Sequence, residues 1–275
     1  MEATKPTEKS TPDELAPLRE LVTALVSIEE SDGAADKARV EILQAIGEML
    51  LREYHIKIGD GFTVEPLWVE GYYYHKGRFE DGSTFQKPKQ KDRFGKLYFH
   101  DSAPGGIDIC LSDADLCGDG YYLSFLIKYS LVRKSEEKEP QFKIQTALYC
   151  TLKDCLKKDG GLAERVVLRK NPSKDEQPLF RLARKGLEPV WKKEADPQRK
   201  KERERYLHEE LAIVKGLNRY SFYWDKGRGK MQTIASYLYR HPCDDPAKWC
   251  EEYLGRTDLT NEILKKYREL LANES

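Results

Sequence analysis

The sequence predicts a single-domain α+β protein, with a curved, mainly antiparallel sheet flanked by helices and with extra helices at the carboxyl end. Short β-type segments, separated by loops rich in Gly, Pro and Asp, follow one another through residues 67–129. Amphipathic helical patterns lie before and after them. The 275 residues, 39% of them hydrophobic, are enough for one large core.

The amino-terminal part is expected to supply the helices behind this sheet. Residues 1–12 are polar, include two prolines, and are expected to be disordered. A first helix is expected at residues 13–27 and a stronger one at 34–54, where apolar residues recur at helical spacing. Gly59, Asp60 and Gly61 then turn the chain into the first aromatic strand.

Four segments have the composition of strands, and each carries a polar residue in an apolar or aromatic setting that stands out as a site candidate. They are residues 67–74 with Glu70, 96–100 with His100, 105–111 with Asp108, and 121–129 with Lys128. A carboxylate in an aromatic strand must either turn to solvent at an edge or face a pocket where a partner compensates its burial. Because side chains alternate along a strand, Tyr72 and Tyr74 share the face of Glu70.

The connecting segments carry weaker signals. Residues 76–94 form a charged loop, whose lysines and arginine either hold phosphate at a pocket mouth or face solvent. Residues 141–155 either continue the sheet or begin a helix. Further along we expect a strand at 165–168, a turn at 171–172, a charged helix at 199–215 that ends at Gly216, a strand at 219–224 and a basic turn at 225–230.

The carboxyl end is expected to be helical. Asp245 followed by Pro246 is typical of a helix cap with proline in the first turn, so a helix is expected at 245–254. A last helix is expected at 261–272. Its inward-facing residues should be Ile263, Leu264, Tyr267, Leu270 and Leu271.

Composition excludes several classes of protein. No apolar run approaches the roughly 20 residues that span a bilayer, and the residues after Met1 lack the order of a secretory signal. A cytoplasmic protein without a membrane partner is therefore expected. The six cysteines and the scattered histidines lack zinc-ligand spacing, so we expect reduced thiols, no metal and no cofactor.

The formal net charge is zero but is unevenly divided. Residues 1–150 contain 19 Lys and Arg against 26 Asp and Glu, a net of −7, whereas residues 151–275 contain 28 against 21, a net of +7. The carboxyl half is thus the better candidate for a phosphate-facing side, although charged helices of any soluble protein produce similar local excesses.

The order of the four polar strands resembles that of the alkyladenine (3-methyladenine) DNA glycosylase family. That family has a Val-Glu-x-Glu-Ala-Tyr strand, a Leu-Tyr-x-Tyr strand, an Asn-Ile strand, and Gly-Asp-Gly followed by Leu-Leu-Arg. The corresponding segments here read Val69-Glu70-Gly71-Tyr72, Leu97-Tyr98-Phe99-His100, Asp108-Ile109, Gly118-Asp119-Gly120 and Leu126-Ile127-Lys128. The resemblance is strong over about a quarter of the chain.

The resemblance implies a role for each polar residue. Glu70 takes the place of the glutamate that activates water, and Tyr72 that of an aromatic residue stacked on the flipped base. His100 replaces a second stacking tyrosine, Asp108 a pocket asparagine, and Lys128 an arginine that contacts the DNA backbone. These three replacements change the chemistry of the pocket. The glycosylase-like domain would cover residues 13–240, and a helical extension at 241–275 has no counterpart in the family.

The leading hypothesis is a monofunctional DNA glycosylase that acts on a damaged or modified base in DNA. Breaking a base–sugar bond needs a carboxylate beside a cationic sugar, and aromatic walls compensate in part for extrusion of the base. Glu70, Tyr72 and His100 supply both. One alternative is a non-catalytic module that binds a modified base or nucleotide in the same pocket. Another is a structural or interaction protein that acts through its charged helices.

Overall fold

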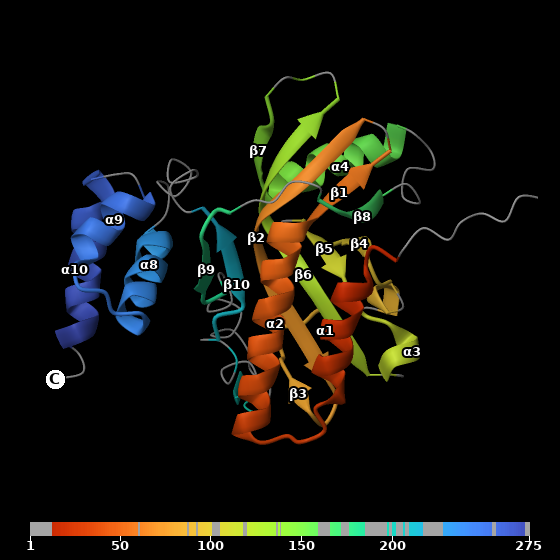
Figure 1. Ribbon diagram of the computed structural model, residues 1–275, viewed down its shortest axis with the longest axis horizontal. Helices are drawn as coiled ribbons and strands as arrows, with labels where there is room; N and C mark the ends of the chain where they lie inside the picture. The colour runs from red at the N-terminus through yellow and green to blue at the C-terminus, as the bar shows by residue number, and fades with distance from the viewer. Residues whose placement is uncertain are drawn as a thin grey trace, which may run out of the picture.

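A computed structural model gives the fold of the chain (Figure 1). The residues it describes are 13–59, 61–86, 88–91, 93–100, 105–117, 120–135, 137, 139–158, 166–171, 176–184, 197, 200–201, 206, 209–216, 228–254 and 257–272. They combine helices with one antiparallel sheet, which confirms the predicted α+β class.

The sheet is built around a long pair of strands, β2 and β6. Along its main path the strands follow the order β4-β5-β6-β2-β1-β8, and β10 also pairs with β2 and with β9. The two end strands of this path, β4 and β8, come back into contact, so the sheet is strongly curled. The bounds are β1 Tyr54–Ile58, β2 Phe62–His75, β3 Phe79–Glu80, β4 Lys96–Phe99, β5 Ile107–Cys110, β6 Tyr121–Lys134, β7 Gln141–Ile144, β8 Val166–Lys170, β9 Leu179–Leu182 and β10 Ala212–Lys215.

Two helices cover one face of the sheet. Helix α2 (Gly33–Glu53) is capped by Asp32, whose Oδ1 accepts from the Ala35 amide at 2.8 Å. It packs very close to β10, because a Cβ placed on Gly47 would lie 2.7 Å from Ile213 Cγ1. Helix α1 (Ala16–Ser27) lies beside it (Figure 1). The predicted packing of the second helix behind the sheet is confirmed.

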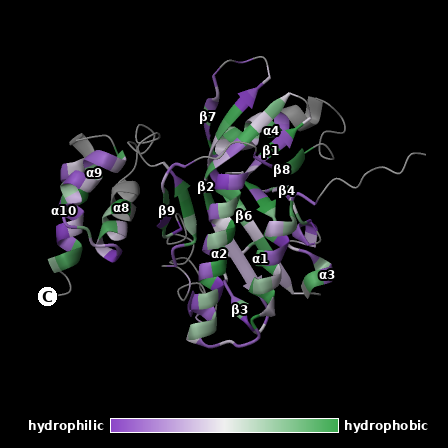
Figure 2. Ribbon diagram, viewed as in Figure 1, coloured by the Kyte–Doolittle hydropathy of each residue, from purple (hydrophilic) through white to green (hydrophobic). Residues whose placement is uncertain are grey.

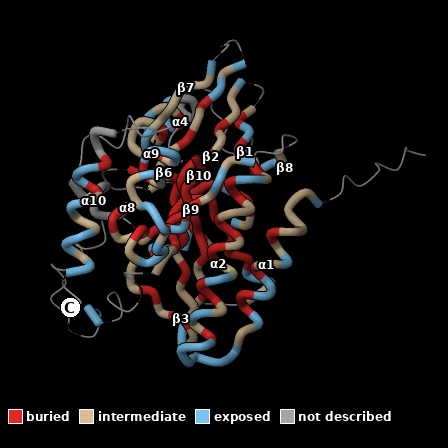
Figure 3. Tube along the Cα trace, turned by 60° about the vertical axis from the view of Figure 1, so that its left-hand side comes forward, coloured by how far each residue is buried: buried red, intermediate tan, exposed pale blue. Residues whose placement is uncertain are grey.

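Alternation along β2 divides its side chains between two faces. Val69 and Tyr73 point into the core that includes α1 and α2. Glu70 and Tyr72 therefore lie on the opposite face, with Trp68. Figure 3 shows the buried residues running through the middle of the molecule at β2, β6 and β10.

The opposite face is covered in part by the carboxyl-terminal helices. Trp68, Ala212 and Val214 from the sheet share a second core with these helices. The helices are α8 Arg228–Arg240, α9 Pro246–Leu254 and α10 Thr257–Ala272. Hydrophilic and hydrophobic residues alternate around them, as expected for helices with one packed side (Figure 2). The Asp245 cap is confirmed, since its Oδ1 accepts from the amides of Ala247 and Lys248 at 3.0 Å.

The predicted helix at 199–215 is wrong at residues 206 and 209–215, the last four of which form β10. All four are buried, and Ala212 pairs with Glu70 on one side and with Leu182 on the other. A short apolar run buried on both faces has no periodicity that separates a strand from a helix. The strand ends at Lys215, and Gly216 follows it with a φ of 58°, which favours glycine.

Other sequence expectations have mixed outcomes. Residues 141–155 are both strand and helix, as β7 and then α4 (Gln145–Lys158), and the strand expected at 165–168 is found as β8. The basic turn is wrong at Arg228–Lys230, which begin α8, and β9 was not predicted. Leu271 is 47% exposed and does not face inward, whereas Ile263 is buried as predicted. The disorder predicted for residues 1–12 and the strand predicted at 219–224 concern segments outside the described residues.

Candidate functional site

Glu70 lies in the middle of the sheet rather than at an edge. Its strand, β2, is flanked by β6 and β10, and Glu70 pairs with Leu126 on one side and Ala212 on the other. The side chain is 0% exposed. Of the two interpretations of this carboxylate, the structure therefore excludes the solvent-facing edge.

The Tyr72 hydroxyl and the Lys128 ammonium both lie at the Glu70 carboxylate. The Tyr72 hydroxyl donates to Oε2 at 3.0 Å, and the Lys128 ammonium lies 3.6 Å from the same oxygen. Tyr72 comes from the same strand, two residues on, and Lys128 from β6. The structure thus brings together Glu70, Tyr72 and Lys128, three of the five predicted site residues. Lys128, predicted to contact the DNA backbone, lies beside the Glu70 carboxylate.

His100 and Asp108 form a second group. His100 Nε2 lies 3.0 Å from Asp108 Oδ2, although the ring nitrogen is not aligned for a hydrogen bond. The same Oδ2 accepts from Gln90 Nε2 at 2.8 Å and from Ser124 Oγ at 3.3 Å. Asp108 Oδ1 is buried without a hydrogen-bond partner among the described residues. One carboxylate oxygen is satisfied by the protein, and the other is left for a donor from elsewhere.

The two groups share one face of the sheet on either side of Leu126. This residue of β6 pairs with Glu70 of β2 and with Asp108 of β5. Residues paired across neighbouring strands point to the same face, and strands lie about 4.8 Å apart, so the backbones of Glu70 and Asp108 are about 10 Å apart. The polar strand residues, scattered over the sequence, thus converge on one face.

Aromatic rings surround His100. Phe85 lies against it with ring centroids 4.8 Å apart, and Tyr98 lies at 5.6 Å. Phe85 is 42% exposed, so the edge of this group reaches solvent. Behind it, a Cβ on Gly106 would lie 3.3 Å from His100 Nδ1. The atom nearest to that Cβ would be Leu126 Cδ1, at 2.9 Å, so a side chain at position 106 would crowd both Leu126 and His100.

The sequence did not point to several residues of this region. Ser124 could have been found from the sequence, because it is a hydroxyl residue in an apolar strand, four residues before Lys128 and therefore expected on the same face. Gln90, on the short 3₁₀ helix η1 (Pro88–Gln90), and Arg184, after β9, carry none, because only the folded chain brings them near Asp108 and Tyr72.

Burial and the neighbouring Glu70 carboxylate keep the Tyr72 hydroxyl protonated, so it acts as a hydrogen-bond donor. Burial is the largest effect and raises the pKa of Tyr72 well above its ordinary value, the negative charge of Glu70 raises it further, and Arg184 opposes them. The Tyr72 hydroxyl therefore remains protonated and directed at Glu70.

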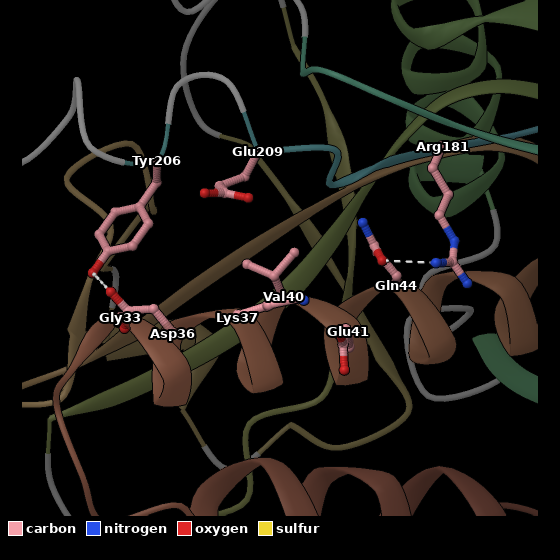
Figure 4. A pocket seen from close by; sticks show the side chains of 9 residues that line it. All are labelled: Gly33, Asp36, Lys37, Val40, Glu41, Gln44, Arg181, Tyr206 and Glu209. Carbon is pink, nitrogen blue, oxygen red and sulfur yellow. Dashed lines mark hydrogen bonds between the residues drawn. The ribbon is translucent and has the colours of Figure 1, made fainter. Parts of the chain in front are cut away.

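A cavity of about 460 Å³ lies away from these residues (Figure 4). One wall is a face of α2, and Arg181, Tyr206 and Glu209 stand opposite. Tyr206 is hydrogen-bonded to Asp36 at one end, and Arg181 donates to Gln44 at the other. Arg181 pairs with Ile213, so this cavity belongs to the α2 side of the sheet and not to the face of Glu70.

The described residues hold no group of three or more His, Cys, Asp or Glu placed to bind a metal ion. In the same part of the chain, no helix combines the length and apolar character needed to cross a membrane. Cys110, Cys150, Cys243 and Cys250 carry free thiols.

No protein-family model, curated protein or solved structure matches this chain. The resemblance to the alkyladenine DNA glycosylases is therefore carried by the ordered strand motifs alone.

Proposed function

We propose that the protein hydrolyses the N-glycosidic bond of a damaged or modified nucleotide in DNA, with Glu70 as the general base and no cofactor. The observation that carries the proposal is the pairing of Leu126 with both Glu70 and Asp108. It sets a buried carboxylate beside a second polar group that has an unsatisfied acceptor and aromatic neighbours. A base-and-sugar substrate needs these two subsites on one face.

The reaction uses one water. Its oxygen bonds to the C1′ carbon of the sugar while the bond from C1′ to the base nitrogen breaks, and the electron pair of that bond leaves with the base. Glu70 takes the water proton and stabilises the cationic character of the sugar. Tyr72 and His100 act as the aromatic walls that compensate in part for unstacking the base, with Asp108 at its edge.

Lys128 has two roles in this proposal. In the free protein its ammonium group covers Glu70. When DNA binds, a backbone phosphate draws Lys128 away, as the resemblance of this position to a backbone-contacting arginine implies, and water reaches the carboxylate. Lys89 and Arg93, both exposed and close in sequence to Gln90, extend the positive surface toward the DNA.

A second candidate function is a module that binds a modified base without cutting it. The complete burial of Glu70 beneath Tyr72 and Lys128 favours this alternative, because catalysis requires water at the carboxylate. In both cases we place the protein in the cytoplasm, as the sequence and its free thiols support.

Single-turnover release of bases from modified duplexes tests the proposal. The panel contains alkylated purines, deaminated purines and 5-substituted pyrimidines. Glu70→Gln should slow release by about 10²–10⁴-fold, the usual contribution of a general base, and should leave DNA binding intact. Glu53→Gln is the matched control, because Glu53 is a half-exposed residue of α2 paired with Lys170.

The outcomes separate the candidates. Release at the same rate by wild type and Glu70→Gln contradicts the role of Glu70. Selective binding of one modified duplex without release by the wild type supports the binding module instead. If the wild type neither binds any modified duplex selectively nor releases a base from one, both candidate functions are contradicted.

A further inference from the structure

Behind Tyr72 lies an ion pair that is buried completely. Arg184 follows β9, Asp81 follows β3, and both side chains are 0% exposed. Burial alone would lower the pKa of Arg184, but the adjacent Asp81 carboxylate raises it above the ordinary value, so the guanidinium stays charged. A buried ion pair is often no more stabilising than apolar residues of the same size, so its place in the fold needs another reason.

The guanidinium group contacts the Glu70 strand at two points. Its NH1 donates to the carbonyl oxygen of Gly71 at 3.2 Å, and its Cζ lies 4.9 Å from the centroid of the Tyr72 ring. NH1 also donates to Asp81 Oδ2, and NH2 donates to the Tyr206 carbonyl at 2.9 Å. Arg184 therefore contacts both the peptide group between Gly71 and Tyr72 and the ring of Tyr72, whose hydroxyl donates to Glu70.

Asp81 connects this ion pair to the group of residues around His100. Its Oδ1 accepts from the Ser83 amide at 2.9 Å, and its carbonyl accepts from the Thr84 amide at 2.9 Å. This turn leads directly to Phe85, which lies against His100. The ion pair thus has two contacts: Arg184 packs on Tyr72, and Asp81 holds the turn that precedes Phe85.

We infer that Arg184, held by Asp81, is a positioning residue that keeps the Tyr72 hydroxyl on Glu70. The inference rests on the proposed function, in which Glu70 is the base. A planar guanidinium donates in two directions while stacking on a ring, and a lysine ammonium does not reproduce this geometry. Arg184→Lys should therefore keep the charge beside Asp81 and lose the alignment of Tyr72.

The test is a double-mutant cycle in single-turnover base release. Arg184→Lys should slow release about 10–100-fold, the cost of misplacing a catalytic group. In a Tyr72→Phe background the same change should cause no further loss, because the hydroxyl it positions is gone. Arg169→Lys, at a half-exposed position of β8, is the control.

A second readout does not depend on activity. In protein labelled with 3-fluorotyrosine, the resonance that disappears in Tyr72→Phe reports the surroundings of Tyr72. Arg184→Lys should move it and Arg169→Lys should not. If Arg184→Lys does not fold, Asp81→Asn, which has nearly the same shape, takes its place in both measurements with the same expected results.

Two results would overturn the inference. One is a folded Arg184→Lys protein with an unchanged fluorine resonance and rate; the other is rate losses that add fully to those of Tyr72→Phe. If the wild type releases no base from any duplex, the proposed function fails. The fluorine spectra then still decide whether Arg184 holds Tyr72.

Discussion

Replacing Asp108 by Asn should reverse the base edge that the pocket accepts. Gln90 and Ser124 both donate to Asp108 Oδ2, whereas Oδ1 is buried without a partner among the described residues. In Asp108→Asn these two donors hold the amide oxygen at the Oδ2 position. The amide nitrogen then takes the Oδ1 position, and an acceptor becomes a donor.

The size of the change follows from the hydrogen bond at that position. A hydrogen bond to a charged, buried group contributes about 1.5–3 kcal/mol, and a buried group left unpaired costs a similar amount. Since 1.4 kcal/mol is a factor of ten, Asp108 should prefer a base that presents an amino group there by about 10–100-fold over one that presents a carbonyl. Asp108→Asn should abolish or invert this preference.

The assay compares paired duplexes that differ only in an amino or a carbonyl group on the purine edge. Binding is measured in a Glu70→Gln background so that cleavage does not interfere, and release is measured with Glu70 intact. Asp244→Asn, at an exposed position before α9, controls for the loss of one negative charge. If the proteins with and without the Asp108→Asn change rank the duplexes in the same order in both assays, the assignment of Asp108 to the base edge is refuted.

Three further predictions concern stability. Burial is the main cause of the raised pKa of Glu209, so this group favours the folded state below its unfolded pKa of about 4.5, and that contribution is lost as pH rises through the folded value. Glu209→Gln should therefore raise the melting temperature at pH 7 but not at pH 4. Gly105→Ala should cost about 1–3 kcal/mol for its φ of 79° and more for a Cβ 2.8 Å from the Tyr149 ring; Gly77→Ala, with a φ of 75° and open space, isolates the strain. Ile213→Ala should cost about 2–5 kcal/mol in chemical denaturation, since the side chain is 0% exposed; a surface-helix cost of a few tenths would contradict the placement of β10.

The sequence predicts best where the signal is local. The aromatic segment around Glu70 and the apolar segment before Lys128 became β2 and β6, because composition and alternation are properties of each strand alone. Asp245 predicted the start of α9 for the same reason, since a cap bonds to amides two and three residues away.

Tertiary pairing decided what the sequence could not. Ala212 lies in a strand because β2 and β9 bind it from both sides, and neither neighbour is close in sequence. Arg184 reaches Gly71 and Asp81 across more than a hundred residues. Alternation along the strand predicts that Glu70 and Tyr72 share a face. The distance between Glu70 and Asp108 could not be predicted, because it depends on the pairing of Leu126 with both of their strands.

The polar residues on the Glu70 face are difficult to explain by stability alone. On the α2 side of the same sheet, the buried charge of Lys215 is closely paired, because its ammonium donates to the Leu51 carbonyl at 3.1 Å and to Glu65 Oε1 at 2.7 Å. Burying Glu70 has a desolvation cost, and the Lys128 ammonium that faces its carboxylate is 23% exposed and 3.6 Å away. Asp108 adds a buried oxygen without a partner among the described residues. Glu70 and Asp108 both pair with Leu126, so these two buried carboxylates lie on the same face of the sheet. A ligand that supplies the donor at Asp108 and displaces Lys128 from Glu70 explains this arrangement better than the stability of the fold does.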